Sequence, residues 1–317
     1  MAPLVSVITP CFEHTEYLAE ALASAVSQGP HVRTIVVDDG SSSDIRRVTD
    51  RFPSVTYLRQ EHAGVSTARN TGLAAQDAPF VLFLDADDRL LPGAVDAGLR
   101  CFEAHPEAGF VFGRYRFINR NGDPAGMPGS VIPATPDYLS LIRANYIGTP
   151  APVLFRSGPV LESGGFDTGL EVSEDYELTL RVARSHPIFF HDTLVAEYRR
   201  YDTSASADAS KMLRTVVMVL ERERSRAPGE LAESPAFDEG LEFFKIFYGV
   251  RVIRQMTREV VLRGRWPQAR SRLAELRRTL GPRLLWRRLP PAVAVSAVRK
   301  SRYIVRGWID NRRRAGR

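Results

Sequence analysis

The first half of the chain alternates short apolar runs with helix-like patterns, and this alternation constrains the fold more than any other feature. Runs of Val, Ile, Leu or Phe predict buried strands over Val5–Thr9, Thr34–Val37, Val55–Leu58 and Phe80–Leu84. The segments between them have helical periodicity over Tyr17–Gln28, Asp44–Arg51 and Ser66–Ala75. Strands that alternate with helices favour βαβ units, so we predict an α/β fold on a mostly parallel sheet.

The pattern loosens after Pro92. Further elements are predicted as helices over Ala94–Ala104 and Glu174–Ser185 and strands over Phe110–Ile118, Pro152–Phe155 and Ile188–Tyr198. The Pro- and Gly-rich span Pro124–Pro136 is expected to be a loop or lid. Long Arg-rich helical patterns begin near Lys211, with an interruption at Ala227-Pro228-Gly229. We therefore predict a first domain over residues 1–215 and a helical, basic C-terminal region over residues 216–317.

Composition sets the broad class of protein. The 317 residues are 44% apolar, which is enough for a packed core, and no stretch approaches the roughly 20 apolar residues that span a bilayer. Two cysteines are too few for a disulfide framework and indicate free thiols in a reducing compartment. The N-terminal run reads as a strand rather than a signal peptide. We expect a cytoplasmic protein, or one that is peripheral on the inner face of a membrane.

Charge is distributed unevenly along the chain. Residues 251–317 contain 20 Lys and Arg but three Asp and Glu, whereas the remaining 250 residues contain 23 and 34. The last segment also carries aromatic residues such as Trp286, Tyr303 and Trp308. Arg beside apolar residues suits a helix on an anionic membrane surface, but also a helix packed on the catalytic domain. A nucleic-acid contact is the least favoured alternative, because no nucleic-acid-binding motif accompanies the charge.

The acidic segment Asp85-Ala86-Asp87-Asp88 directly follows a predicted buried strand. In open α/β sheets ligands bind beyond the carboxyl ends of the strands. Asp85 and Asp87 could present oxygens to one hard cation that offsets charge on a departing phosphate. A solvated acidic turn fits this short motif equally well.

Three other segments carry candidate residues. Asp38-Asp39 follows the second strand and could bind a base or ribose, although the same residues are good turn and N-cap chemistry. Arg69 lies one turn inside a helix that begins after Gly64, where it could pair with phosphate or remain a surface arginine. Glu174-Asp175 opens a helix, where an acid could act as a general base or merely favour the helix dipole.

Taken in order, these segments resemble the family 2 glycosyltransferases of the GT-A fold over about residues 4–205. The resemblance is carried by Val5–Glu13, Val36–Ser41, Gly64–Gly72, Leu84–Asp88, and Gly164–Asp167 followed by Glu174-Asp175. It implies an enzyme that transfers a sugar from a nucleotide-diphosphate sugar to an acceptor hydroxyl, with inversion at the anomeric carbon. The acceptor is expected to be a polysaccharide or a lipid-linked glycan precursor.

The resemblance also implies roles for particular residues. Nucleotide-sugar binding is expected from Pro10, Phe12, Glu13, Asp39, Arg69 and Asp85. Asp85 and Asp87 match the aspartate–any–aspartate motif that holds Mg²⁺ or Mn²⁺, and Asp175 matches the catalytic base.

Two departures from the family pattern stand out. Phe12 and Glu13 occupy positions where Tyr and Asn are common, and Arg199-Arg200-Tyr201 stands where many members end in Arg-x-His. A metal contact from that histidine is therefore not carried over to this chain.

Two alternative functions are weighed against this one. A sugar nucleotidyltransferase would share the fold and the metal, but it would ordinarily have a Gly-rich loop after the first strand, where this chain has Pro10–His14 without glycine. An inactive, membrane-associated scaffold of the same fold is disfavoured by the intact Asp85, Asp87 and Asp175.

Overall fold

The computed structural model describes residues 3–13, 15–201, 207–263, 271–274 and 276–279, and the chain divides into two compact units. The first unit comprises Met1–Pro128, Ala134–Tyr138 and Ile147–Tyr201, and the second Gly129–Pro133, Leu139–Tyr146 and Asp202–Arg317. Every candidate site residue lies in the first unit. The domain boundary after residue 215 stays a prediction.

A nine-stranded sheet forms the body of the first unit, in the order β3-β2-β1-β4-β8-β6-β9-β5, with β7 paired to β6. The strands are Val5–Cys11 (β1), Val32–Asp38 (β2), Val55–Arg59 (β3), Phe80–Phe83 (β4), Arg89–Leu90 (β5), Phe110–Ile118 (β6), Pro124–Gly126 (β7), Val153–Arg156 (β8) and Ile188–Arg199 (β9). β1 to β4, β6 and β9 run in one direction, and β5, β7 and β8 run in the other. The sheet is thus mixed but mostly parallel, which confirms the predicted α/β class.

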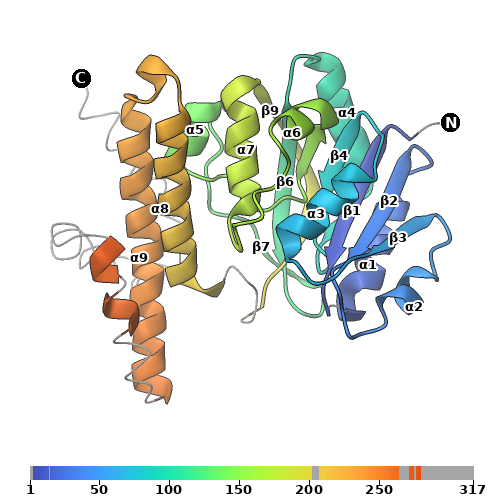
Figure 1. Cartoon of the computed structure of the whole chain (residues 1–317), viewed down its shortest axis with the longest axis horizontal. Coiled ribbons are helices and arrows are strands. Elements are labelled where there is room, and N and C mark those ends of the chain that lie inside the picture. The colour runs from blue at the N-terminus through green and yellow to red at the C-terminus, as the bar shows by residue number, and fades with distance from the viewer. Residues whose placement is uncertain (1–2, 14, 202–206, 264–270, 275, 280–317) are drawn as a thin grey trace. The chain divides into compact units, whose positions relative to one another are not determined.

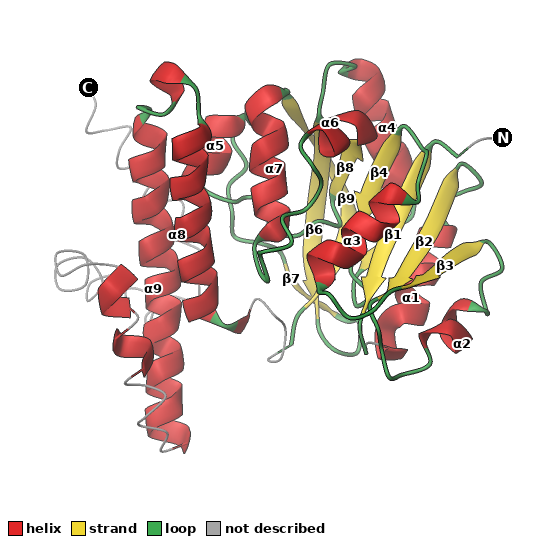
Figure 2. Ribbon diagram, in the orientation of Figure 1, coloured by secondary structure: helices red, strands yellow, loops and turns green. Residues whose placement is uncertain are grey.

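The described residues include the helices α1 (Thr15–Val26), α2 (Ile45–Thr49), α3 (Val65–Ala74), α4 (Ala94–Ala104), α5 (Tyr138–Arg143), α6 (Ser157–Glu162), α7 (Glu174–Ser185), α8 (Ala209–Arg226) and α9 (Pro235–Arg263). Within the first unit, α1 and α2 cover one face of the parallel strands and α3 covers the other (Figures 1 and 2). This reversal occurs because the chain returns from β3 at the edge to β4 beside β1. The predicted GT-A-like arrangement of a sheet flanked by helices is confirmed.

Apolar spacing explains why these helices form where they do. Leu18 and Leu22 lie one turn apart on α1, are fully buried, and pack in a core cluster with Val36 of β2. At the start of α2, the side chain of Asp44 accepts a hydrogen bond from the backbone N–H of Arg47 at 2.9 Å, as an N-cap residue should.

A glycine allows α3 to approach the sheet closely. Gly72 faces β1, and a Cβ atom added there would collide with the side chain of Ile8. Arg69 lies three residues earlier, on the same side of the helix, and is therefore directed toward the sheet rather than toward solvent. This packing explains why Arg69 is only 2% exposed.

The ends of β1, β2 and β4 position the candidate site. β1 pairs in parallel with both β2 and β4, with Cys11 opposite Asp38 and Ile8 opposite Phe83. The carboxyl ends of these strands consequently meet at one edge of the sheet, and the segments that follow them carry Phe12, Asp39 and Asp85.

Several elements depart from the prediction in detail. The span expected to be a loop or lid begins with the short strand β7, and β5, α5 and α6 are elements that periodicity did not predict. They are only two to six residues long, too short for an apolar period to show. In the second unit, α8 and α9 carry the predicted helical pattern. They are separated at the predicted interruption, Ala227-Pro228-Gly229, whose last residue begins a 3₁₀ turn over Gly229–Leu231.

Candidate active site

The acidic loop Asp85–Asp88 leaves the sheet at the end of β4. The Asp88 N–H donates to the Asp85 carbonyl at 3.0 Å, which closes a tight turn and gathers the three carboxylates. Asp85 and Asp87 are half-buried, whereas Asp88 is fully buried. Burial, followed by the charges of Asp87 and Asp85, raises the pKa of Asp88 well above its usual range. The loop thus concentrates negative charge in a small volume.

The donor atoms of this loop suit a hard divalent cation. Mg²⁺ and Mn²⁺ prefer oxygen ligands, and carboxylates supply them here. Within the described part of the chain, one oxygen of Asp88, Oδ2, is buried without a hydrogen-bond partner. No group of three or more His, Cys, Asp and Glu side chains among the described residues is arranged to hold a metal by itself.

Arg69 connects the acidic loop to the start of α7. Its two terminal nitrogens donate to Asp85 Oδ1 at 2.5 Å and to Glu174 Oε1 at 2.6 Å. Its guanidinium also lies over the ring of Phe166, 5.0 Å from the centroid. Although burial opposes the charge, the two carboxylates outweigh it and raise the pKa of Arg69 above its ordinary value. The arginine is permanently charged and completely enclosed.

Asp175 follows Glu174 in the first turn of α7. It is half-buried, and its Oδ1 accepts a hydrogen bond from the Tyr176 N–H at 2.8 Å. Burial, and then repulsion by Glu174, raises the pKa of Asp175 to about 7, against the opposing charge of Arg69. A carboxyl group with this pKa can accept a proton near neutral pH, which is what a general base requires.

Asp39 ties together the segment between β3 and α3. Its Oδ1 accepts from Gln60 Nε2 at 2.7 Å and from the Ala63 N–H at 2.9 Å. Its Oδ2 accepts from the Gly64 N–H at 2.9 Å and lies 3.0 Å from His62 Nδ1. Both oxygens are engaged within the protein, so the position of the loop depends on this carboxylate.

Phe12 and Glu13 follow β1 beside this segment. The ring of Phe12 is 41% exposed and stacks on His62, with centroids 4.0 Å apart. Glu13 accepts hydrogen bonds from the Ser42 N–H at 2.7 Å and from the Ser43 hydroxyl at 2.5 Å. These donors lower the pKa of Glu13 to about 2, so it is ionised throughout the physiological range. Pro10 is buried within β1.

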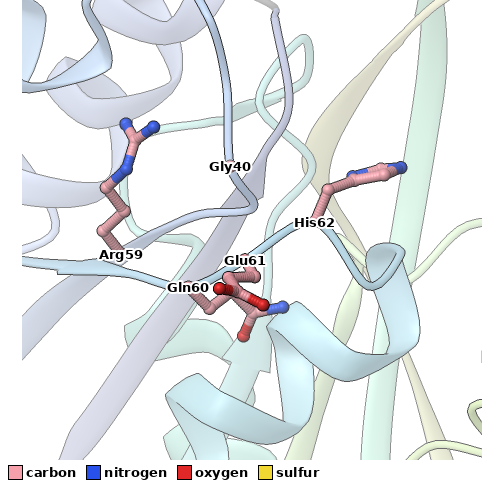
Figure 3. Close-up of a pocket in the computed structure, with 5 residues that line it drawn as sticks. All are labelled: Gly40, Arg59, Gln60, Glu61 and His62. Atoms are coloured by element: carbon pink, nitrogen blue, oxygen red, sulfur yellow. The ribbon is translucent and has the colours of Figure 1, made fainter.

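An open pocket of about 530 Å³ lies at the ends of β2 and β3. It is lined by Gly40, Arg59, Gln60, Glu61 and His62 (Figure 3). In Figure 3 the side chains of Arg59 and His62 lie apart, and those of Gln60 and Glu61 lie between them. The pocket adjoins the Asp39 network through Gln60 and His62.

The structure brings the predicted residues together in two groups at the same sheet edge. Phe12, Glu13 and Asp39 are tied to the β2–α2 and β3–α3 connections, whereas Arg69 and Asp85 are tied to the start of α7. Sequence reasoning missed His62, which stacks on Phe12. It noted Tyr201 only as a departure from the family pattern and missed its contact with the acidic loop, where the hydroxyl donates to Asp87 Oδ2 at 2.6 Å. Neither contact could be recognised locally, because the partners lie 50 and 114 residues away along the chain.

Comparison with known proteins begins with the sequence. Residues 6–154 match the model of the family described as Glycosyl transferase family 2. Over 129 residues the chain is 32% identical to TuaG of Bacillus subtilis (strain 168), named as a teichuronic acid biosynthesis glycosyltransferase; the match covers 38% of this chain and 50% of TuaG. Matches span 74% of one Mycobacterium tuberculosis relative but only 31% to 50% of four others. The chain thus corresponds to part of several relatives.

Two solved structures share the fold. S. aureus TarS 1-349 in complex with UDP matches with a TM-score of 0.63 and 20% identity over 89% of this chain and 81% of that one. The mannosyltransferase PcManGT from Pyrobaculum calidifontis, in complex with GDP-Man and Mn²⁺, matches with a TM-score of 0.57 and 17% identity over 94% and 87%. At such identities the likeness establishes the fold alone.

Proposed function

The chain belongs to glycosyl transferase family 2, and from this premise we propose that it transfers a sugar from a nucleotide-diphosphate sugar to an acceptor hydroxyl with inversion. One observation carries the proposal: buried Arg69 joins Asp85, on the acidic loop, to Glu174, the neighbour of Asp175. A carboxylate loop suited to a diphosphate and its cation is thereby held beside a carboxyl group suited to proton transfer. The proposed transfer uses both.

The acceptor side of the reaction is assigned to Asp175. The acceptor oxygen bonds to the anomeric carbon as the bond from that carbon to the diphosphate oxygen breaks. Asp175 takes the proton of the acceptor hydroxyl, and the nucleoside diphosphate leaves with the bonding electron pair. The raised pKa of Asp175, about 7, supports this role because it brings the basicity of the carboxylate close to ambient pH.

The donor side is assigned to the acidic loop. Asp85 and Asp87 would hold Mg²⁺ or Mn²⁺, which offsets negative charge on the leaving diphosphate. Oxygen-only donors and the orphaned Asp88 oxygen support this assignment. The contact between Arg69 and Asp85 fixes that carboxylate, and Arg69 is assigned to the donor site through it rather than as a direct phosphate ligand. PcManGT, of the same fold, was solved with GDP-Man and Mn²⁺.

The nucleoside is assigned to the other group of residues. Phe12 offers an exposed ring for stacking, and Asp39 holds the connection beside the pocket that Gln60 and His62 line. Pro10, near the end of β1, and Glu13, hydrogen-bonded to the β2–α2 connection, are assigned to the same binding region. TarS, of the same fold, was solved in complex with UDP. A pocket with a stacking ring and polar walls supports nucleoside binding at this position.

A cell-envelope glycan or its lipid-linked precursor is the proposed acceptor, by analogy with TuaG and its naming for teichuronic acid biosynthesis. Within the described residues, no helix combines the length and apolar character needed to cross a membrane. The basic tail that suggested peripheral membrane binding, residues 281–317, lies outside the described residues. Its contact with a membrane stays a prediction.

A donor screen tests the proposal directly. UDP-, GDP- and dTDP-sugars are added to the purified protein with and without Mn²⁺, and the melting temperature is followed. Ligand at 100 times its Kd stabilises by about 2.7 kcal/mol, so one nucleotide class should raise the melting temperature in the presence of Mn²⁺. The same donor should then be consumed when an acceptor glycan is supplied. If no nucleotide sugar shifts the melting temperature or is consumed, the proposal is wrong.

A further inference from the structure

The end of β9 and the residues that follow it contact the acidic loop independently of Arg69. The backbone N–H of Arg199 donates to Asp88 Oδ1 at 2.8 Å, and its Nε donates to the Asp87 carbonyl at 2.8 Å. Two residues further on, the hydroxyl of Tyr201 donates to Asp87 Oδ2 at 2.6 Å. The backbone of Asp87 and its carboxylate are thus held by two different residues of one strand end.

Arg199 is a rigid anchor for this strand end. Its side chain is completely buried, and its terminal nitrogens donate to the carbonyls of Asn119 and Arg120 and to Glu20 Oε2 at 2.7 Å. The guanidinium also lies 4.1 Å from the ring centroid of Tyr17. An arginine with this many partners fixes the loop backbone without help from its neighbours.

Tyr201 contacts the carboxylate of Asp87 through its hydroxyl. Its ring is positioned by the guanidinium of Arg120, 5.4 Å from the centroid, and by the ring of Tyr17, with centroids 6.3 Å apart. These ring contacts hold the hydroxyl in position to donate to one oxygen of Asp87. Since Arg199 already holds the loop backbone, the tyrosine hydroxyl is not needed to form the turn. Its effect is to select one orientation of the Asp87 side chain.

We propose that Tyr201 is a positioning residue for the metal, which orients the Asp87 carboxylate toward a divalent cation by hydrogen bonding to its Oδ2. The inference rests on the proposed function, since it takes Asp87 to be a metal ligand. Groups that hydrogen-bond to a ligating carboxylate set its direction and commonly matter for metal affinity. Tyr201 thereby contributes to the site through a ligand, where many members of the family carry a histidine.

Mn²⁺ binding tests the role without an activity assay. Mn²⁺ is titrated into the full chain, alone and with UDP or GDP, and the free ion is measured by electron paramagnetic resonance. Tyr201→Phe keeps the ring and removes only the hydroxyl, so we expect Mn²⁺ affinity to fall about 10-fold, at the lower end of the range for such partners. The melting temperature should stay close to that of the unmodified protein, because the ring contacts and the Arg199 anchor remain.

Two further variants make the result decisive. Tyr57→Phe is the matched control, because it removes a tyrosine hydroxyl that donates to another buried aspartate, Asp38, at 2.7 Å; its Mn²⁺ affinity should be unchanged. Asp87→Ala should abolish Mn²⁺ binding. If Asp87→Ala abolishes binding but Tyr201→Phe binds as tightly as the unmodified protein, the positioning role is overturned and the metal site stands. If the unmodified protein does not bind Mn²⁺ under any of these conditions, or Asp87→Ala leaves binding intact, the assignment of the metal to Asp87 fails as well.

Discussion

Two acidic turns follow strands at the same edge of the sheet, and their carboxylates are in opposite states. After β2, both oxygens of Asp39 are engaged, and so are both oxygens of Asp38, which accepts from the Ser41 N–H, Tyr57 and Arg59. After β4, burial and like charges raise the pKa of Asp88, and its Oδ2 is orphaned within the described residues. In the first turn every carboxylate oxygen is engaged. In the second, Arg69 pairs with Asp85, but one buried oxygen of Asp88 has no hydrogen-bond partner within the described residues.

This difference separates two uses of the same side chain. A carboxylate that accepts several backbone N–H groups stabilises a loop, and its removal leaves buried donors unpaired. A buried acid beside two others costs free energy, so its presence indicates a charge that arrives from outside the protein. We therefore expect substitutions in the Asp38-Asp39 turn to affect folding, and substitutions in the Asp85–Asp88 loop to affect chemistry.

The largest effect is expected from Asp87→Ala. Loss of a metal ligand removes several kcal/mol of transition-state stabilisation, so transfer should fall by at least about 10³-fold. The melting temperature should hardly change, because the loop backbone is still held by Arg199. The measurement is the transfer rate beside a thermal melt, with Asp77→Ala, whose side chain is 78% exposed, as a surface control.

Removal of the metal with a chelator tests the same role without a substitution. EDTA should inactivate the unmodified protein, and Mn²⁺ or Mg²⁺ should restore it. Full activity in EDTA, or in Asp87→Ala, would remove the metal from the mechanism. It would also contradict the expectation that substitutions in the Asp85–Asp88 loop affect chemistry.

Asp175→Asn is expected to have the next largest effect. Asparagine keeps the shape and a carbonyl acceptor but cannot take a proton, and general-base catalysis contributes about 10²–10⁴-fold. The loss should fall on kcat, with donor affinity nearly unchanged, because the base acts only in the transition state. Transfer kinetics and calorimetric donor binding measure the two quantities separately.

Glu174→Gln is the matched control for the base. Glu174 is 8% exposed and accepts from Arg69 at 2.6 Å, so its amide variant weakens a buried ion pair. We expect this variant to have a lower melting temperature than the unmodified protein and a nearly unchanged kcat. If instead Glu174→Gln loses kcat and Asp175→Asn does not, the base is Glu174.

Asp39→Asn tests whether the Asp38-Asp39 turn stabilises the fold. An amide nitrogen would face a backbone N–H in place of one carboxylate oxygen, and an unpaired buried group costs about 1–3 kcal/mol. Urea unfolding should show this loss, together with weaker donor binding. Asp44→Asn is the control in the same segment, because asparagine caps a helix as well as aspartate does. Unchanged stability in Asp39→Asn would mean that the Asp39 carboxylate is not needed to stabilise its turn.

How far the sequence predicts this structure depends on the range of the contacts. The strands β1 to β4 and the helices α1 to α4 were predicted within a few residues, because each has its own apolar period and Asp44 marks a helix start. The acids Asp39, Asp85 and Asp175 stand out because each directly follows a strand or opens a helix. The roles of Pro10, Phe12 and Glu13 are implied by the family resemblance alone. Their partners could not be found in the same way: Arg69 contacts Glu174 across 105 residues, and nothing near either residue indicates the pair.

The burial of Arg69 shows the same limit. From the sequence it could equally be a surface arginine. Gly72 indicates close packing of this helix on the sheet only once Ile8 of the neighbouring strand is known to face it. Solvation and pKa depend on such packing, so the raised pKa of Asp175 could be recognised only in the folded chain.

The smallest expected effect, and the last prediction, concerns pH. Asp175 must be ionised to accept a proton, and its pKa is raised to about 7 by burial and by Glu174. Below pH 7 kcat should therefore fall about tenfold per pH unit, and above pH 8 it should be level. An aspartate with its usual pKa near 3.9 would give a flat profile over the same range.

Stability provides an independent check with a fixed sign. Between about pH 4 and pH 7 Asp175 is protonated in the folded protein but ionised in the unfolded chain, so the folded state binds more protons. The contribution of Asp175 to stability must therefore decrease as pH rises through this window, which is the reverse of the usual behaviour of a salt-bridged aspartate. Asp175→Asn removes the titration, so its melting temperature should exceed that of the unmodified protein at pH 8 and approach it at pH 5. If kcat is level from pH 5 to 8, and Asp175→Asn and the unmodified protein melt at the same temperature at pH 8, the pKa of Asp175 is not raised.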